Sequence, residues 1–259
     1  MLAVVAVFAP MASAAQSLAT YRIISDVEPF ESVNVAKRIN VTLVHYSDVG
    51  KLPSAVATKL QKNKAAATRV GKGLPVCIVR AEPTVAKAVK CESKDGSLDI
   101  YADKFKYKRS PTIDVYVVCD GNLRSISGTS GSNITSKGCL LSPGLSLIAE
   151  FAMSIHVTVS APSVSVVAKN SSDIGLTGTI GTLSAALKSG SNLRMRKVTC
   201  GSATITAEGE STAQVNATSS LVVHSSSRSR VTYYAPGASL DLHAESLGEV
   251  SELKIWENL

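Results

Sequence analysis

The sequence predicts an all-β protein of the β-helix or β-solenoid class, in which short strands coil about one axis. Strand-like segments recur every nine to ten residues in the C-terminal half, and such a period is typical of a repeat architecture. Each segment alternates apolar and polar side chains, as a strand with one buried face does. Aromatic residues make up only 5% and charged residues 18% of the 259 residues. This composition argues against a helical bundle, a coiled coil or a disordered chain.

The amino terminus resembles an export signal. An apolar run over residues 2–9 precedes Ala12-Ser13-Ala14, whose small residues match a signal-peptidase cleavage site. The run is too short to span a bilayer, and it lacks the usual preceding positive charge, so we expect a truncated signal or an upstream start. We therefore expect residues 1–14 to be removed and residues 15–259 to form a single exported domain. The alternative is that the apolar run is a buried strand.

The N-terminal half contains further strands. Alternating side chains predict strands over residues 32–35 and 39–44, and again over residues 98–101 and 113–118. The dipeptide Asp95-Gly96 precedes the third of these strands. Because both residue types tolerate positive φ, it predicts a tight hairpin turn there.

Residues 51–90 differ from the rest of this half. They contain a Lys-Leu-Gln-Lys sequence and a run of alanines, which predict a short surface helix. Gly71, Gly73 and Pro75 follow and are expected to end it.

The repeat in the C-terminal half is the most informative feature. Its segments are Leu193–Arg196, Ala203–Ala207, Thr212–Asn216, Leu221–Ser225, Val231–Tyr234, Leu240–Ala244 and Glu249–Leu253. Alternate members recur after 18 to 19 residues, a plausible length for one coil, with Ser, Gly and Asn in the turns. A β-sandwich of hairpins and a β-solenoid both fit this pattern. The evenness of the turns favours the solenoid, in which each coil buries its apolar side chains against its neighbours.

Several motifs resemble one known family in their order and spacing. They are Phe30-Glu31-Ser32-Val33, Arg38-Ile39-Asn40-Val41-Thr42-Leu43, Lys94-Asp95-Gly96-Ser97-Leu98-Asp99-Ile100, Ile113–Val118, Leu123–Ile126 and Ser127–Ser132, followed by repeated Ser-Gly-Ser-Asn-like steps. Together they resemble the putative auto-transporter adhesin, head GIN domain family over about residues 28–245. The resemblance implies a right-handed β-helix-like fold on an exported protein of Gram-negative bacteria, and it brings no catalytic residues.

Two features depart from the family pattern. Arg38 stands where the family has a glycine, so this turn is expected to differ. Residues 51–90 are longer than usual, and we expect them to be an insertion.

The chain is basic, with 27 Lys and Arg against 20 Asp and Glu and a formal net charge of +7. Such an excess fits an anionic glycan, an anionic membrane surface or nucleic acid, or it serves only solubility. Because aromatic side chains do not interleave with the basic residues, nucleic acid is disfavoured as a partner.

The five cysteines are Cys77, Cys91, Cys119, Cys139 and Cys200. No two are spaced as Cys-x-x-Cys, so neither a zinc ribbon nor a thioredoxin-type motif is predicted. In an exported protein they form one or two disulfides, or they remain buried thiols.

The first candidate binding surface is a basic patch. Arg194 and Arg196 lie near Lys188 and Lys197, and the outward side chains of this strand could contact an anionic glycan or a phosphate group. The alternative is a solvated edge with no ligand.

The second candidate binding surface is a histidine pair. His224 and His243 are 19 residues apart, at equivalent outward positions of successive proposed coils, with Asp241 nearby. Stacked strands lie about 4.8 Å apart, so the two rings are expected to be neighbours. A divalent metal could bind there, but three aligned ligands are not evident. We therefore predict two surface histidines and no metal or other cofactor.

No constellation in the sequence predicts catalysis. Carboxylates cluster only at the C-terminal end, at Asp241, Glu245, Glu249 and Glu252, whereas general acid–base chemistry needs two positioned groups. The first hypothesis is an exported cell-surface or periplasmic module that binds a glycan or an envelope protein and does not span the membrane. The alternatives are a polysaccharide-cleaving, pectinase-like enzyme, and a structural component whose solenoid ends stack between copies.

Overall fold

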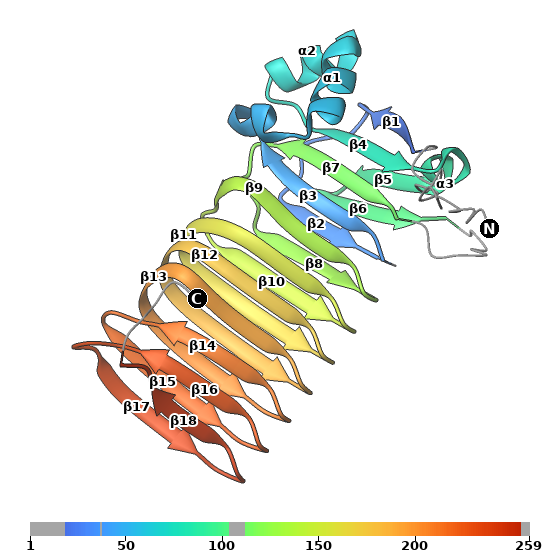
Figure 1. Ribbon diagram of the computed structural model, residues 1–259. Coiled ribbons are helices and arrows are strands. Elements are labelled where there is room, and N and C mark those ends of the chain that lie inside the picture. The colour runs from blue at the N-terminus through green and yellow to red at the C-terminus, as the bar shows by residue number, and fades with distance from the viewer. Residues whose placement is uncertain (1–18, 37, 104–111, 255–259) are drawn as a thin grey trace, which may run out of the picture.

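The computed structural model describes residues 19–36, 38–103 and 112–254, and the predicted signal segment 1–14 lies outside these residues. Strands account for 58% and helices for 13% of the structure. Parallel strands stack into a long β-solenoid, with helices gathered at one end (Figure 1). The predicted fold class is therefore confirmed.

The described residues form 18 strands and four helices. The strands are β1 (Thr20–Ile24), β2 (Ser32–Val35), β3 (Asn40–His45), β4 (Val76–Ala81), β5 (Val89–Lys94), β6 (Ser97–Ala102), β7 (Asp114–Cys119), β8 (Ser125–Thr129), β9 (Asn133–Leu141), β10 (Leu145–Glu150), β11 (Ser154–Lys169), β12 (Asp173–Lys188), β13 (Asn192–Ala207), β14 (Thr212–Asn216), β15 (Ser220–Ser225), β16 (Arg230–Tyr234), β17 (Ser239–Ala244) and β18 (Glu249–Glu252). The helices are the 3-10 helix η1 (Tyr46–Lys51) and the α-helices α1 (Ser54–Lys62), α2 (Lys64–Gly71) and α3 (Pro83–Ala88).

Each coil contributes to two parallel sheets that enclose the core. Face A consists of β6, β2, β8, β10, the second halves of β11, β12 and β13, and then β15 and β17. Face B consists of β7, β3, β9, the first halves of β11, β12 and β13, and then β14, β16 and β18. Strands β11, β12 and β13 are 16 residues long and run through both faces.

The coil length predicted from the sequence is confirmed. On face B, successive strands begin at residues 154, 173, 192, 212, 230 and 249, which spaces them by 18 to 20 residues. The strands pair in parallel between coils rather than as hairpins within one sheet, so the solenoid alternative is correct and the sandwich is wrong.

The core is a set of aliphatic ladders between the two faces. The equivalent residues Ile155, Ile174 and Leu193 of three successive coils are all fully buried. Parallel strands in register place like residues above one another, so an aliphatic side chain in one coil packs on its counterpart in the next. A narrow interior filled in this way leaves few positions for large rings, which accounts for the low aromatic content.

The corners between face A and face B have a repeating structure. From β8 onward, every corner that leads from face A to face B has two consecutive residues with positive φ, as at Asn170 (56°) and Ser171 (61°), and most of these corners then have a buried serine. Ser191 is one of these serines: its hydroxyl donates to the carbonyl of Lys188 at 2.8 Å and accepts from the backbone N–H of Ser172 in the preceding coil at 3.2 Å. The Ser-Gly-Ser steps of the sequence are thus corners that bond one coil to the next.

The region 51–90 contains more structure than its sequence predicts. A helix is present as expected, but it is followed by two more helices and by strands β4 and β5, which the sequence analysis missed. Asn63 begins α2 by accepting the backbone N–H of Ala66 at 3.0 Å on its side chain. Helices α1 and α2 bury Val56, Leu60 and Ala66 against the outer side of face B.

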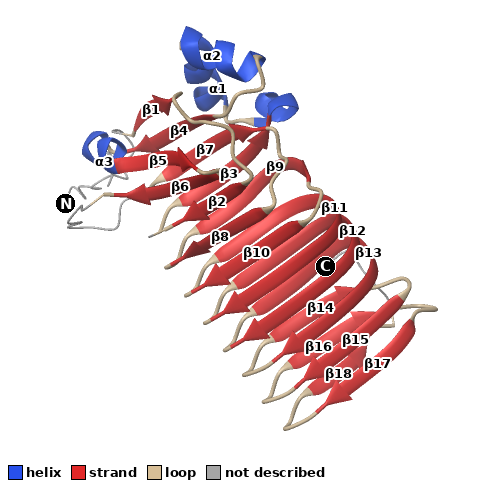
Figure 2. Cartoon of the chain, turned by 180° about the vertical axis from the view of Figure 1, so that it is seen from behind, coloured by secondary structure: helices blue, strands red, loops and turns tan. Residues whose placement is uncertain are grey.

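This region closes the N-terminal end of the solenoid. Strand β5 pairs antiparallel with β6 on face A, while β4 pairs antiparallel with β7 and β1 with β4 on face B. The strands β2 and β3 lie inside this end, between β6 and β8 on face A and between β7 and β9 on face B. Figure 2 shows the helices and antiparallel strands at one end of the stack and β17 and β18 at the other.

The structure bears on the expected hairpin turn at Asp95-Gly96 and on the expected change of turn at Arg38. Asp95 (φ 50°) and Gly96 (φ 75°) join β5 to β6 in the predicted hairpin turn. Arg38 keeps a positive φ of 58°, so the backbone retains here a conformation that glycine adopts most readily.

All five cysteines are free thiols, so the disulfide alternative is not realised. Burial raises the pKa of the Cys119 thiol to about 12. The hydrogen bond with Cys91, followed by burial, raises the pKa of Cys77 well above its usual range. These neutral thiols pack as small apolar groups rather than reacting as nucleophiles.

Candidate functional site

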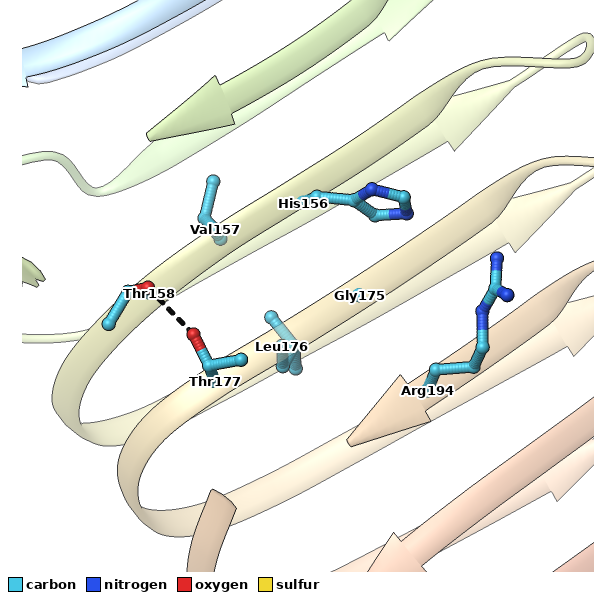
Figure 3. A pocket seen from close by; sticks show the side chains of 7 residues that line it. All are labelled: His156, Val157, Thr158, Gly175, Leu176, Thr177 and Arg194. Atoms are coloured by element: carbon cyan, nitrogen blue, oxygen red, sulfur yellow. Dashed lines mark hydrogen bonds between the residues drawn. The ribbon is translucent and has the colours of Figure 1, made fainter. Parts of the chain in front are cut away.

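The outer surface of face B carries a hollow of about 320 Å³ near the middle of the solenoid. It is lined by His156, Thr158, Gly175, Thr177 and Arg194, together with Val157 and Leu176 (Figure 3). Three neighbouring coils supply these residues, because β11, β12 and β13 pair in parallel.

A glycine opens the hollow between two long side chains. The strand register places His156, Gly175 and Arg194 in one row across the three coils. Figure 3 shows His156 and Arg194 on either side of Gly175. A Cβ atom on Gly175 would lie 2.7 Å from Cδ2 of the His156 ring. The absence of a side chain at this position therefore makes room for the imidazole.

Asp173 links the two side chains that flank the glycine. Its Oδ2 lies 2.7 Å from Nε2 of His156 and also accepts a hydrogen bond from Nη2 of Arg194. Burial pushes the pKa of the Asp173 carboxyl upward, but the hydrogen bonds from His156 and Arg194 outweigh it and hold the pKa below its usual value. The carboxylate is therefore ionised at neutral pH and fixes the positions of both neighbours.

The second carboxylate oxygen of Asp173 has no such contacts. Its Oδ1 is buried, and the protein atoms of the described residues provide no hydrogen-bond partner for it. A buried acceptor without a partner costs free energy, and because protein atoms enclose it, this oxygen does not face a ligand in the hollow.

Two threonine hydroxyls complete the polar lining. The Oγ1 atoms of Thr158 and Thr177 lie 2.7 Å apart in the adjacent row. The hollow thus presents a guanidinium, an imidazole ring and two hydroxyls on a rigid sheet, and the ionised carboxylate of Asp173 bonds the first two. These groups can both donate hydrogen bonds to a polar ligand and accept hydrogen bonds from it.

Of the sequence-predicted residues, only Arg194 lines this hollow. The sequence analysis missed His156, Asp173 and Gly175. A signal was present, because His156, Gly175 and Arg194 follow one another at the 19-residue period of the repeat. Aligning the coils by that period would have placed them in one row.

The basic patch expected around Arg194 is divided between the two faces. Arg194 is paired with Asp173 on face B, while Lys188 at the end of β12 on face A lies 3.1 Å from Glu208. Lys197 is exposed at an irregularity in β13, where the pairing with β12 shifts by one residue. Arg196 belongs to the same strand, and its side chain lies outside what the structure describes.

The structure brings the histidine pair together as expected from the coil length. His224 and His243 are paired residues of β15 and β17, and their rings stack at a centroid distance of 5.0 Å and an angle of 5°. Oδ1 of Asp241 lies 2.7 Å from Nε2 of His243. Within the described ranges, no group of three or more His, Cys, Asp or Glu residues could hold a metal ion. This pair lies on face A, away from the hollow.

Two of the acidic residues at the C-terminal end are paired with basic side chains. Glu249 bonds Arg230 at 2.7 Å, and Asp241 bonds His243. Each of these carboxylates is matched with a basic side chain on its own face of the sheet.

Fold and site together define a β-solenoid with a polar hollow on its flat outer surface, a class suited to binding rather than to enclosing a substrate. The sequence profile of one family, described as putative auto-transporter adhesin, head GIN domain, matches residues 69–236. That match covers more than half of the chain. The chain belongs to this family, and the resemblance stated from its motifs is confirmed.

Solved structures share the fold at low sequence identity. A putative adhesin from Bacteroides fragilis superposes with a TM-score of 0.73 at 14% identity, covering 91% of this chain and 97% of its own. A putative adhesin from Parabacteroides distasonis gives 0.68 at 15%, covering 92% and 98%. A structure described as a putative lipid binding protein from the same species gives 0.60 at 12%, covering 92% and 98%. Among curated proteins, none is significantly similar to this chain.

Proposed function

We propose that this protein is a non-enzymatic binding module that recognises a hydroxyl-rich glycan through the hollow over Gly175. Membership of the adhesin family supports binding to some partner. The observation that carries the proposal is the hollow itself, because it gathers complementary polar groups on a surface that is otherwise a regular sheet.

The chemistry of the lining favours a neutral sugar over an anion. The charge of Arg194 is matched by Asp173, so the hollow offers no unpaired cation for a phosphate or sulfate. Carboxylate and guanidinium groups can instead accept from and donate to neighbouring sugar hydroxyls. The hydroxyls of Thr158 and Thr177 provide further donors and acceptors for such hydroxyls, and the exposed ring of His156 provides a surface for the sugar C–H groups.

The absence of a second carboxylate supports binding without catalysis. Among the described residues that line the hollow or bond to its lining, Asp173 is the single carboxylate, and both His156 and Arg194 engage it. Glycoside hydrolysis by the usual mechanisms needs two carboxyl groups across the scissile bond.

Glycan-array screening of the full chain, followed by calorimetric titration of the best ligand, tests this function. We expect at least one neutral glycan to bind, with Arg194→Ala and Gly175→Val each weakening binding by about tenfold or more, because one removes a donor and the other fills the hollow. The control is Arg228→Ala, since Arg228 is an exposed arginine at a corner far from the hollow. Finding no glycan ligand, or equal affinity for all variants, would contradict the proposal.

We also propose that the protein acts outside the cytoplasm. The family suggests a surface or exported protein, and residues 2–14 have the pattern of a signal peptide. No helix in the described part of the chain is long and apolar enough to cross a membrane. Cell fractionation of a tagged full chain, with and without Ala12-Ser13-Ala14 replaced by large residues, tests this location. Retention of the unaltered chain in the cytoplasm would contradict it.

A further inference from the structure

The C-terminal end of the solenoid exposes side chains that every inner coil buries. In β17, Leu240 is 46% and Leu242 is 36% exposed. Their counterparts in the preceding coil, Leu221 and Val223, are fully buried. The two leucines are therefore core residues by position, and no further coil of the described residues covers them.

The two strands of this last coil are also free along one edge. Among the described strands, β17 pairs only with β15, and β18 pairs only with β16. The outer backbone groups of such edge strands are ready to pair with another strand. At the opposite end, α3 packs against β1, β4 and β5 and buries Val85 and Ala86, so a helix covers the core there.

We propose that the C-terminal end binds a second copy of this chain, with β17 of each copy pairing antiparallel across a two-fold axis. Because one end of the solenoid is closed, the two copies meet C-terminal end to C-terminal end. Such a contact uses the same surface on both copies, so it closes as a dimer and does not extend into a filament.

The alternation of side chains restricts the register of this pairing. Residues opposite one another in an antiparallel pair point to the same side of the sheet. The two-fold axis therefore passes through a residue of β17 and not between two. With the axis at Leu242, Leu242 meets its own counterpart and Leu240 lies opposite Ala244 of the second copy, both over the core, and Asp241 lies opposite His243 of the second copy.

Charge complementarity selects this register over its neighbours. Centring the pair on Asp241 would place two carboxylates against each other, and centring it on His243 would place two imidazoles together. Only the pairing centred on Leu242 places Asp241 of each copy opposite His243 of the other copy. The polar side chains of β17 thus select the register, and in that register Leu240, Leu242 and Ala244 of both copies form one apolar row.

Sedimentation velocity of the full chain from low to high micromolar concentration tests the proposal. We expect a reversible dimer in the wild type, and a dissociation constant raised by about tenfold or more in Leu240→Glu/Leu242→Glu, because these side chains lie at the centre of the contact. The matched control is Leu141→Glu, an exposed leucine (61%) elsewhere in the solenoid, which should dimerise normally. Urea unfolding of each variant establishes that it is folded.

A cysteine placed on the axis tests the register. Leu242→Cys should be joined to its counterpart by a short thiol cross-linker at dimer concentrations, whereas Ser165→Cys, an exposed position at the middle of face A, should not. A wild type that stays monomeric at all concentrations would overturn the proposal. So would a dimer that survives Leu240→Glu/Leu242→Glu, or one cross-linked equally at both positions.

Discussion

Asp173 shows at the scale of one residue how the repeat creates a site. The carboxylate reaches His156 on one neighbouring coil and Arg194 on the other, so it bridges three strands. The sequence identified Arg194 as a candidate, because an arginine on an outward strand position stands out on its own. It did not identify Asp173, because nothing local distinguishes an acid that bonds to residues 17 and 21 positions away.

The lowered pKa of Asp173 predicts a pH-dependent contribution to stability. A carboxyl whose folded pKa lies below its unfolded value, about 3.9, stabilises the fold fully above that value and loses the effect as the pH falls through the folded pKa. We expect Asp173→Asn to lower the free energy of unfolding by roughly 0.5–1 kcal/mol at pH 7, since both partners are partly exposed to solvent. The difference from wild type should be smaller at pH 3, which lies below the unfolded value, than at pH 7.

Urea unfolding at both pH values measures this effect, and Arg194→Ala completes the comparison. If the two side chains share one interaction, the loss in the double variant should be smaller than the sum of the single losses. Additive losses, or a difference that grows at low pH, would rule out the stabilising role of this carboxylate.

At the scale of the element, the corner serines explain why such short strands hold together. Each corner places two residues in the left-handed region, a conformation that is costly for most side chains. The buried serine that follows satisfies a carbonyl of its own coil and an N–H of the coil before it. The first of these hydrogen bonds fixes the turn, and the second fixes its stacking on the preceding coil.

Ser191→Ala is therefore expected to destabilise the protein by roughly 1–3 kcal/mol, because it leaves a buried N–H and a buried carbonyl without this partner. Equilibrium unfolding in urea measures the loss. Ser165→Ala, at an exposed position on face A, serves as the control and should change stability by less than about 0.5 kcal/mol. Equal effects at the two positions would mean that the corner hydroxyl contributes nothing.

Elements that depend on local sequence were predicted better than those that depend on the stack. The first helix of region 51–90 follows from its residue propensities, and the Asp95-Gly96 turn follows from its tolerance of positive φ. Strand β4 was missed because it pairs antiparallel with β7 and β1, which are distant in sequence. Five of its six residues are buried, so it shows no alternation. Strand β5 does alternate at Val89, Lys90, Cys91 and Glu92, and it is the first strand of the hairpin whose turn was predicted, so its signal was present but not used.

At the scale of the whole molecule, each coil is stabilised only by the coils next to it. Inner coils have neighbours on both sides, and β17 and β18 have a neighbour on one side. We expect amide hydrogen exchange of the monomer to be slowest in β11, β12 and β13 and fastest in β17 and β18. Mass-spectrometric exchange at low protein concentration measures this gradient. Uniform protection along the solenoid would show that it opens only as a single cooperative unit.

The sequence by itself determined that this protein is a β-solenoid of the head GIN domain family, because period, alternation and turn residues are all local properties that each coil repeats. It also determined that His224 and His243 are neighbours, since their separation equals one coil. Only the tertiary structure decided where the polar hollow lies and which end of the stack is open. Those features depend on which coils are adjacent, on the glycine that leaves a gap between two of them, and on the antiparallel strands that cover one end. Such relations between distant residues arise only when the coils stack.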